Sequence, residues 1–165
     1  MNKKLIAMLF FMAPIALFAQ KFGHLNTMEI MQVMPELKAA ETKLQNQRKE
    51  YSEDIERLQA EFLKSVNEYE AQMATLPETI KQRREGELQE MQIRMQERAQ
   101  DYERQLQQDY EKEMSLISEK INKAIKEVGA AGGYLYIFDI SSVPYINDTL
   151  SKDVTAEVKA KLGIQ

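Results

Sequence analysis

Residues 36–128 read ELKAAETKLQNQRKEYSEDIERLQAEFLKSVNEYEAQMATLPETIKQRREGELQEMQIRMQERAQDYERQLQQDYEKEMSLISEKINKAIKEV. This stretch of about 93 residues is rich in Glu, Gln, Lys, Arg, Leu, Met and Ala, which are strong helix formers. Its apolar residues recur in steps of three and four, which is the period of a helix and not of a strand. The sequence therefore predicts a fold dominated by helix.

The apolar stripe repeats at intervals of eleven residues over most of its length. The ladders are Tyr51–Phe62–Met73 in the first half, and Leu88–Ala99–Tyr110–Ile121 and Met95–Leu106–Ile117–Val128 in the second. Only the start, from Leu37 to Leu58, has the seven-residue spacing of a heptad. An eleven-residue period corresponds to helices that stay straight or supercoil weakly to the right.

One break interrupts the stretch, at Thr75-Leu76-Pro77-Glu78. Thr75 as N-cap and Glu78 three residues later predict a capping box, with Pro77 in the first helical turn. We expect two antiparallel helices of about 39 and 53 residues, reaching roughly 60 and 80 Å, with a tip near residues 74–78. Gly86 is a second candidate for the bend, although a single glycine inside a polar helix is more often tolerated.

The first nineteen residues have the pattern of a secretory signal peptide. Lys3 and Lys4 precede an apolar run of fourteen residues, 5–18, and Ala19 is a small residue at a plausible cleavage point. The run is too short for a comfortable membrane span, and an uncleaved anchor is the alternative. We expect a mature chain that begins near Gln20 and is soluble beyond the inner membrane, in the periplasm. The chain has no cysteine, so neither a lipid-modified cysteine nor a disulfide is expected.

The remaining segments, 20–35 and 129–165, predict a small β-rich body. Expected elements are a strand over 22–26, a helix over 27–34, a strand over 134–140 that is buried on both faces, an edge strand over 143–146 and a helix over 153–162. Residues 147–152 are expected to be loop, and the long helix to end at Gly129. So small a core rarely supplies enough stability alone, which favours oligomerisation through this end. The candidate oligomer residues are Phe22, Leu25, Tyr134, Leu135, Tyr136, Ile137, Phe138 and Ile140. The fold class is thus α+β, mostly α, with a long helical hairpin arm over 36–128 projecting from an oligomerisation body.

Residues that could carry catalysis are scarce. The single histidine, His24, lies in the first expected strand and has no cysteine partner, so a structural role is favoured over a metal ligand or base. No phosphate-binding glycine loop is present. Without residues 1–19 the chain carries 20 Lys and Arg against 26 Asp and Glu, which argues against a nucleic-acid partner. We expect no enzymatic activity, cofactor or metal.

Two groups near the tip are candidates for binding. The first is apolar and consists of Met73, Leu76, Ile80, Met91 and Met95. Methionine adapts to varied partners, although simple packing between the helices is the alternative for most of these side chains. The second group is basic and consists of Lys81, Arg83 and Arg84. The five positive residues within 78–98 are balanced by five glutamates, so a solvated face is the alternative there.

Four segments together resemble a known family. They are INKAIKEVG at 121–129, YLYIFD at 134–139, VPYIND at 143–148 and DVTAEVKAKL at 153–162. With the signal peptide and the hairpin, they make the whole mature chain similar to the Skp family of periplasmic chaperones, also called OmpH.

This resemblance implies a homotrimer whose arms enclose a cavity, and an ATP-independent holdase that carries unfolded outer-membrane β-barrel proteins across the periplasm. The best-known members are basic and have positive arm tips, whereas this chain is acidic. Its charge argues against lipopolysaccharide or membrane-surface binding, for which Lys81, Arg83 and Arg84 would be the candidates. The alternative function is a structural coiled-coil protein of the envelope that binds one folded partner.

Overall fold

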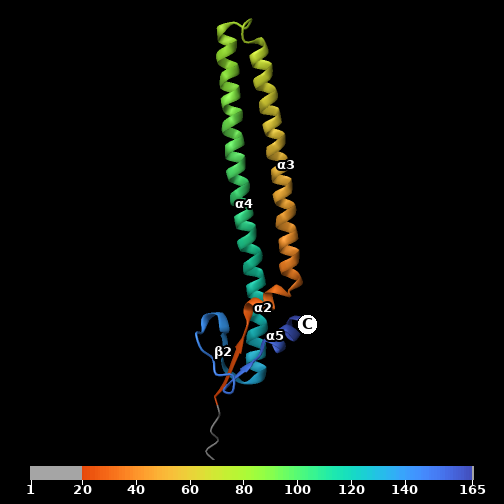
Figure 1. Cartoon of the computed structure of the whole chain (residues 1–165), viewed down its shortest axis with the longest axis vertical. Coiled ribbons are helices and arrows are strands. Elements are labelled where there is room, and N and C mark those ends of the chain that lie inside the picture. Colours follow the sequence, from red (N-terminus) through yellow and green to blue (C-terminus); the bar gives the residue numbers. More distant parts are fainter. Residues whose placement is uncertain (1–19, 165) are drawn as a thin grey trace, which may run out of the picture.

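A long helical hairpin on a small mixed body makes up the structure, a computed structural model that describes residues 20–164. Helix α3 (Pro35–Gln72) and helix α4 (Glu78–Gly132) run antiparallel, and the remaining elements gather at their root (Figure 1). The signal peptide predicted for residues 1–19 lies outside the described residues. Among the residues that are described, no helix is both long and apolar enough to cross a membrane.

The turn at the tip lies where the sequence predicts it, but its capping differs. Helix α4 begins at Glu78, with Pro77 as N-cap and no side chain capping the end. Thr75 instead donates its hydroxyl to the carbonyl of Gln72 at 2.9 Å, closing the end of α3. The predicted capping box is therefore wrong: the N-cap is two residues later than expected, so Glu78 is the first residue of the helix and not its third. Gly86 lies inside α4 and not at the bend, which is the alternative that the sequence favoured.

The root end of α4 is longer than expected. The helix continues through Gly129 to Gly132, so the two helices contain 38 and 55 residues. It stops at Gly133, which has a φ of 65°. A left-handed residue of this kind ends many helices, and glycine adopts it without steric cost.

Three parallel strands form the sheet in the order β2-β1-β3. Strand β1 (Lys21–Leu25) is central, β2 (Tyr134–Asp139) follows the hairpin, and β3 (Ser151–Asp153) is the other edge. The whole hairpin is thus the crossover between β1 and β2. The register shifts between Lys21 and Phe22, which places a bulge in the β1–β2 pairing.

The segment after β2 does not match the sequence prediction. No strand forms at 143–146; a 3₁₀ turn, η2 (Ile140–Ser142), follows β2, and Asp139 accepts a hydrogen bond from Ser141 N. Strand β3 forms instead at the end of the segment expected to be loop and includes Asp153, the first residue of the expected helix. Helix α5 (Thr155–Leu162) therefore starts two residues later than predicted. A proline at position 144 has no N–H for a ladder, which explains why this stretch does not pair.

The buried core lies at the root of the hairpin. Helix α2 (Thr27–Gln32) contributes Ile30 to it and is capped by Asn26, whose side chain accepts a hydrogen bond from Glu29 N. The other fully buried large side chains are Leu25, Met34, Ile121, Val154 and Val158. These residues come from β1, α4, α5 and the loops beside them, so the core ties the sheet to the base of the arm.

Strand β2 is not buried on both faces within one chain, contrary to the prediction. Tyr134 and Ile137 pack against the core, whereas Tyr136 is 57% and Phe138 44% exposed. Leu135 at the bulge is also exposed. The described helices cover one face of this small sheet, which leaves the other apolar face open.

Candidate functional site

The root half of the arm is held together by polar contacts between its two helices. We call these contacts the proximal rungs. They are the pairs Glu36–Lys120, Lys43–Glu113 (2.6 Å), Gln47–Asp109 (2.8 Å), Tyr51–Gln105 (2.9 Å) and Asp54–Tyr102 (2.6 Å). Each step along α3 is matched by an equal step back along α4, so the rungs fix the register of the hairpin.

An aromatic pair ends the proximal rungs. The rings of Tyr51 and Tyr102 stack with centroids 3.9 Å apart and planes within 5°. The Tyr102 hydroxyl donates to Asp54, and this hydrogen bond, with a second one from Arg57, lowers the pKa of Asp54. The same bond raises the pKa of Tyr102, because the carboxylate accepts from the protonated phenol.

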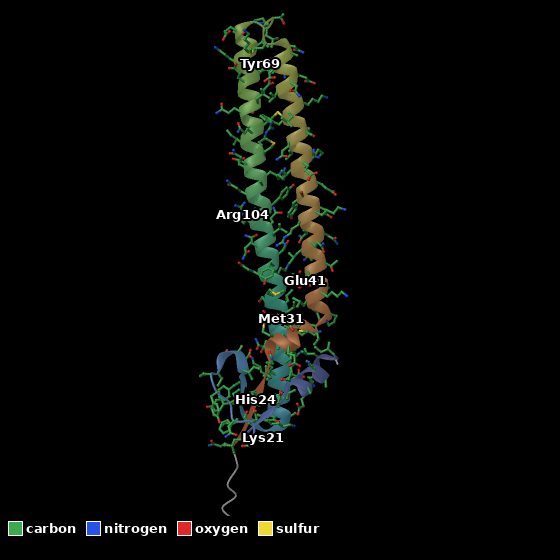
Figure 2. The ribbon with its side chains drawn as sticks, viewed as in Figure 1. Lys21, His24, Met31, Glu41, Tyr69 and Arg104 are labelled. Carbon is green, nitrogen blue, oxygen red and sulfur yellow. The ribbon has the colours of Figure 1, made fainter. Side chains whose placement is uncertain are left out.

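Beyond the Tyr51–Tyr102 pair, the contacts between the two helices of the arm are mainly apolar. The next cross-helix hydrogen bond is near the tip, where Tyr69 donates to Glu85 at 2.6 Å and its pKa rises to about 12 (Figure 2). In the described structure, no hydrogen bond or ion pair joins 55–68 to 87–101. We call these two facing segments the distal interval. Half-buried apolar side chains hold it together, among them Leu58, Phe62, Val66, Leu88, Met91 and Met95.

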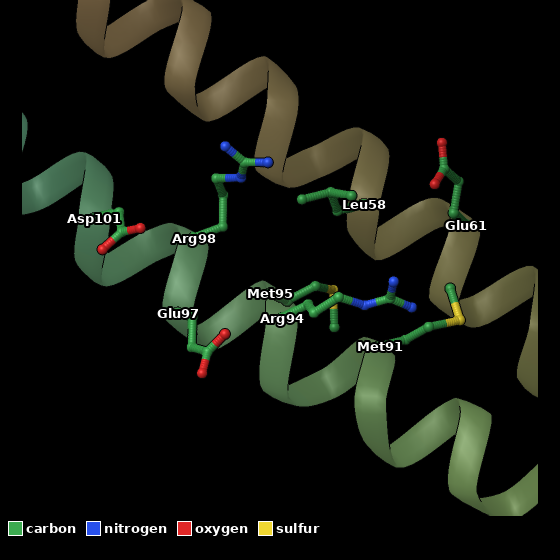
Figure 3. A pocket seen from close by; sticks show the side chains of 8 residues that line it. All are labelled: Leu58, Glu61, Met91, Arg94, Met95, Glu97, Arg98 and Asp101. Carbon is green, nitrogen blue, oxygen red and sulfur yellow. The ribbon is translucent and has the colours of Figure 1, made fainter.

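A cavity of about 480 Å³ lies in the distal interval (Figure 3). Its lining consists of Leu58 and Glu61 from α3 and Met91, Arg94, Met95, Glu97, Arg98 and Asp101 from α4. A smaller one of about 140 Å³ lies closer to the tip and shares Met91 with the first. Both hollows are lined by apolar and charged side chains together. Hollows are not confined to this part of the arm, because one of about 700 Å³ lies along residues 35–50 at the root of α3.

The structure separates the five apolar candidates. Met91 and Met95 line the larger cavity, and Leu76 lines the smaller one with Met91. Ile80 is half-buried beside the tip, while Met73 follows the last residue of α3 and is 46% exposed. The candidates therefore form no single site.

The sequence did not single out Leu58, Arg94 and Arg98 as site residues, although Leu58 belongs to the recognised stripe. The eleven-residue ladders fail at Met73 and at Tyr110, which are both exposed. At the second of these points, Asp109 takes the inward position beside Gln47.

The basic candidates near the tip have acidic partners. Lys81 lies 3.9 Å from Glu78, and Arg83 and Arg84 lie 3.6 and 2.9 Å from Glu87. Arg83 and Arg84 share Glu87, so the three positive charges have two glutamate partners on α4. This arrangement is that of a solvated helix face and offers little attraction for an anionic surface.

The oligomer candidates of the body divide between two faces of the sheet. Leu25, Tyr134 and Ile137 belong to the core side. On the open side, Tyr136 stacks with Phe22 (6.3 Å between centroids) and with Phe138 (5.8 Å). We call Phe22, Tyr136, Phe138 and the neighbouring exposed Leu135 and Ile140 the open face. Contiguous exposed apolar surface of this kind is typical of an interaction site.

His24 has the surroundings of a structural residue. It is 8% exposed, its Nδ1 lies 2.9 Å from Ser151 Oγ, and its Nε2 lies 3.9 Å from Asp148 (Figure 2). The contact to Ser151 ties β1 to β3. Within residues 20–164, no group of three or more His, Asp or Glu side chains is placed to hold a metal ion.

Sequence comparison places the chain in a known family. A family model described as "Outer membrane protein (OmpH-like)" matches residues 21–162, so the chain belongs to the OmpH-like family. Two curated relatives are the chaperone protein Skp of Yersinia enterocolitica and that of Photorhabdus luminescens. Each is 24% identical over 140 residues, which cover 85% of this chain and 84% of the relative.

The fold is shared with a solved structure. An OmpH-like protein from Caulobacter crescentus, described as an outer membrane chaperone, matches with a TM-score of 0.74 at 16% identity. The match covers 87% of this chain and 83% of that one. The family and the fold class inferred from the sequence are therefore both confirmed.

Proposed function

We propose that this protein is an ATP-independent periplasmic holdase, which binds unfolded outer-membrane β-barrel proteins between the arms of a homotrimer and prevents their aggregation. The observation that carries the proposal is the distal interval of the arm. There, half-buried apolar side chains, methionines among them, take the place of the hydrogen bonds and ion pairs that join the two helices nearer the root. Two relatives that match over 84% of their length are named as Skp chaperones, which supports the same function.

The trimer is proposed on the open face of the body. Burying apolar area stabilises by about 25 cal/mol per Å², and Phe22, Tyr136 and Phe138 offer such area without a covering layer in one chain. Copies that associate through this face leave their arms free. An α4 of 55 residues reaches about 80 Å, long enough to bound a cavity for an unfolded chain.

Release without ATP follows from the kind of contact that the arm offers. Each dispersion contact is individually weak, so a client held by many of them can leave step by step when a better partner competes. The thioether side chains of Met91 and Met95 adapt to different client side chains. We propose neither a catalytic step nor a cofactor. Because the basic residues at the tip are paired with glutamates, we also propose no lipopolysaccharide site there.

The test uses purified residues 20–165. A urea-unfolded outer-membrane β-barrel protein is diluted into buffer with and without the chain, in the absence of ATP, and aggregation is followed by light scattering. The proposal expects suppression that saturates near three chains per client. A Phe138→Asp variant is expected to suppress less, because it places a charge on the open face; Lys112→Asp, which alters an exposed position of the arm root, is the control. Unchanged scattering at a large excess would reject the holdase and favour an envelope protein that binds one folded partner.

A further inference from the structure

We propose that Tyr51 and Tyr102 are a site of oxidative modification, at which a one-electron oxidant couples the two side chains to dityrosine and joins α3 covalently to α4. The reagent of this reaction is defined by its class: an oxidised metal complex or an oxidising radical that removes single electrons. The inference goes beyond the holdase function and does not depend on it. It rests on the contact between the two rings, on the proton acceptor beside them and on the separation of this pair from the other tyrosines.

The two rings already have the contact that coupling needs. Their centroids lie 3.9 Å apart and their planes differ by 5°. Dityrosine forms through a ring carbon beside the hydroxyl group of each tyrosine, and stacking at this distance brings the carbons of the two rings into van der Waals range. Hydrogen bonds to Gln105 (2.9 Å) and to Asp54 (2.6 Å) hold the Tyr51 and Tyr102 rings in place from opposite helices. The pair is therefore arranged for reaction within one chain.

Asp54 supplies a proton acceptor for the first oxidation. Its carboxylate accepts the Tyr102 hydroxyl proton at 2.6 Å. The hydrogen bonds from Tyr102 and Arg57, together with the charge of Arg98, lower the pKa of Asp54, so the carboxylate is ionised at neutral pH. A phenol that has lost an electron is a much stronger acid than a carboxylic acid, so the proton moves to Asp54 even though the arginines weaken it as a base. The Tyr51 hydroxyl lies at an exposed contact, where water takes its proton.

The reaction balances without any group from the protein other than the two phenols and Asp54. Each tyrosine gives one electron to the oxidant and loses its hydroxyl proton, which leaves two phenoxyl radicals. The radicals form one carbon–carbon bond between the two rings. The hydrogen on each joined carbon then moves to the phenolic oxygen, which restores both aromatic rings. In total the oxidant accepts two electrons, and Asp54 and water accept two protons.

The other tyrosines lack such a partner. Among residues 20–164, the stacked aromatic pairs are Tyr51 with Tyr102, Phe22 with Tyr136, and Tyr136 with Phe138, so only the first contains two tyrosines. Tyr51 and Tyr102 are half-buried, whereas Tyr145, for example, is 76% exposed. Exposed tyrosines couple on collision with another chain. Coupling inside one chain is expected at Tyr51 and Tyr102.

The new bond would lie where the proximal rungs meet the distal interval. Beyond the pair, the next hydrogen bond between the helices is Tyr69–Glu85, so the rings have room to tilt toward each other as the bond forms. A link between residues 51 and 102 closes a loop of about 50 residues and restricts the unfolded chain, as a disulfide does. Oxidation would thus lock the register that the proximal rungs set.

The test oxidises the full mature chain, residues 20–165, at neutral pH with a photogenerated ruthenium(III) complex and persulfate. Single chains are separated from coupled chains under denaturing conditions, and their dityrosine fluorescence and intact mass are measured. The expected product is a single chain lighter by two hydrogen atoms, whose digest contains a peptide pair joined through Tyr51 and Tyr102. Single chains without this product would overturn the proposal.

Matched phenylalanine variants assign the site. Tyr51→Phe and Tyr102→Phe keep the ring but remove one phenol, so each is expected to abolish the product within single chains. Tyr110→Phe removes an exposed tyrosine of α4 outside the pair and should react like wild type. If Tyr110→Phe loses as much product as Tyr51→Phe does, the assignment to this pair is wrong. Circular dichroism of each variant confirms that its helices are intact.

The role of Asp54 is tested by the rate of coupling. Asp54→Asn replaces the carboxylate with an amide, a far weaker base, and is expected to slow product formation by about tenfold or more. Glu53→Gln changes the neighbouring carboxylate, whose ion-pair partner is Lys49, and should leave the rate unchanged. Equal rates in these two variants would reject Asp54 as the proton acceptor.

The lock is tested by thermal unfolding before and after oxidation. The wild-type midpoint is expected to rise by about 5–15 °C relative to that of Tyr51→Phe treated in the same way. The comparison cancels oxidation of other side chains, such as methionines, because that damage is common to both samples. Equal changes in the two midpoints would show that the bond does not lock the hairpin.

Discussion

Replacing Gly132 with Ala is expected to destabilise the body, although alanine is the better helix former. A Cβ at Gly132 would lie 2.3 Å from Cε2 and 2.7 Å from Cδ2 of Tyr134. The ring has no free space on its other edge, because a Cβ at Gly23 would meet its Cδ1 at 3.2 Å. Lys21 Nζ lies 4.0 Å from the ring centroid. The Tyr134 ring therefore occupies a slot between two glycines, one at the end of α4 and one in β1.

The size of the effect follows from two opposing contributions. Overpacking of this kind costs about 1–3 kcal/mol, and the higher helix propensity of alanine returns up to about 1 kcal/mol. The net loss expected is roughly 1–2 kcal/mol, which lowers the midpoint of thermal unfolding by about 2–8 °C for a chain of this size. Thermal unfolding followed by circular dichroism measures it.

The same substitution elsewhere in α4 is the control. Gly86 has no atom within 4 Å of the position that its Cβ would take. Gly86→Ala is therefore expected to raise stability by up to about 1 kcal/mol, through helix propensity alone. If Gly132→Ala is as stable as Gly86→Ala, the slot does not constrain Tyr134 and the reasoning is refuted.

Three further predictions concern the arm and the core. Tyr102 and other partners lower the pKa of Asp54, so the stability that these contacts contribute is present above the ordinary carboxyl pKa of 3.8 and is lost as the pH falls below that value. Near-UV circular dichroism of the stacked tyrosines should show this loss, and the Asp54→Asn variant should not show it. The raised pKa of Tyr69 has the opposite consequence: its hydrogen bond is intact below pH 10 and is lost as the pH rises through about 12. Comparing the tyrosinate absorbance of the wild type with that of Tyr69→Phe detects this loss. Ile121→Ala in the buried core should cost about 2–5 kcal/mol in urea unfolding, whereas Leu116→Ala, at a 52% exposed position of the same helix, should change stability by less than about 0.5 kcal/mol; equal losses would contradict the assigned core.

The arm could be predicted from sequence because its signals are local and long. A period sustained over about 93 residues defines two helices, and Pro77 marks the turn between them. The capping box was wrong because it depends on the first helical residue, which is Glu78. Helix ends shift by one or two residues with the local turn geometry, which the residue types near Thr75 do not determine.

The body was harder to predict because its contacts are distant in sequence. Strand β3 has only three residues, Ser151 to Asp153, and no apolar alternation. It pairs because β1 offers it backbone partners and because His24 contacts Ser151. The two apolar faces of β2 indicated burial, but one chain covers only the face that carries Ile137.

The candidate site was predictable only in part. The stripe identified Met91 and Met95, which do line the cavity. The charged side chains of the lining were not identified, because which of them face α3 depends on their position in space and not on spacing along α4 alone. Met73 was assigned to the same group but lies just past the end of α3, where its side chain is 46% exposed.

The central claim is that copies of this chain together hold one unfolded outer-membrane protein. Native mass spectrometry of residues 20–165, mixed with such a client diluted from urea in the absence of ATP, tests it most directly. The predicted result is a complex of three chains with one client. A spectrum that contains only single chains and free client, or an oligomer that never acquires a client, would contradict the account.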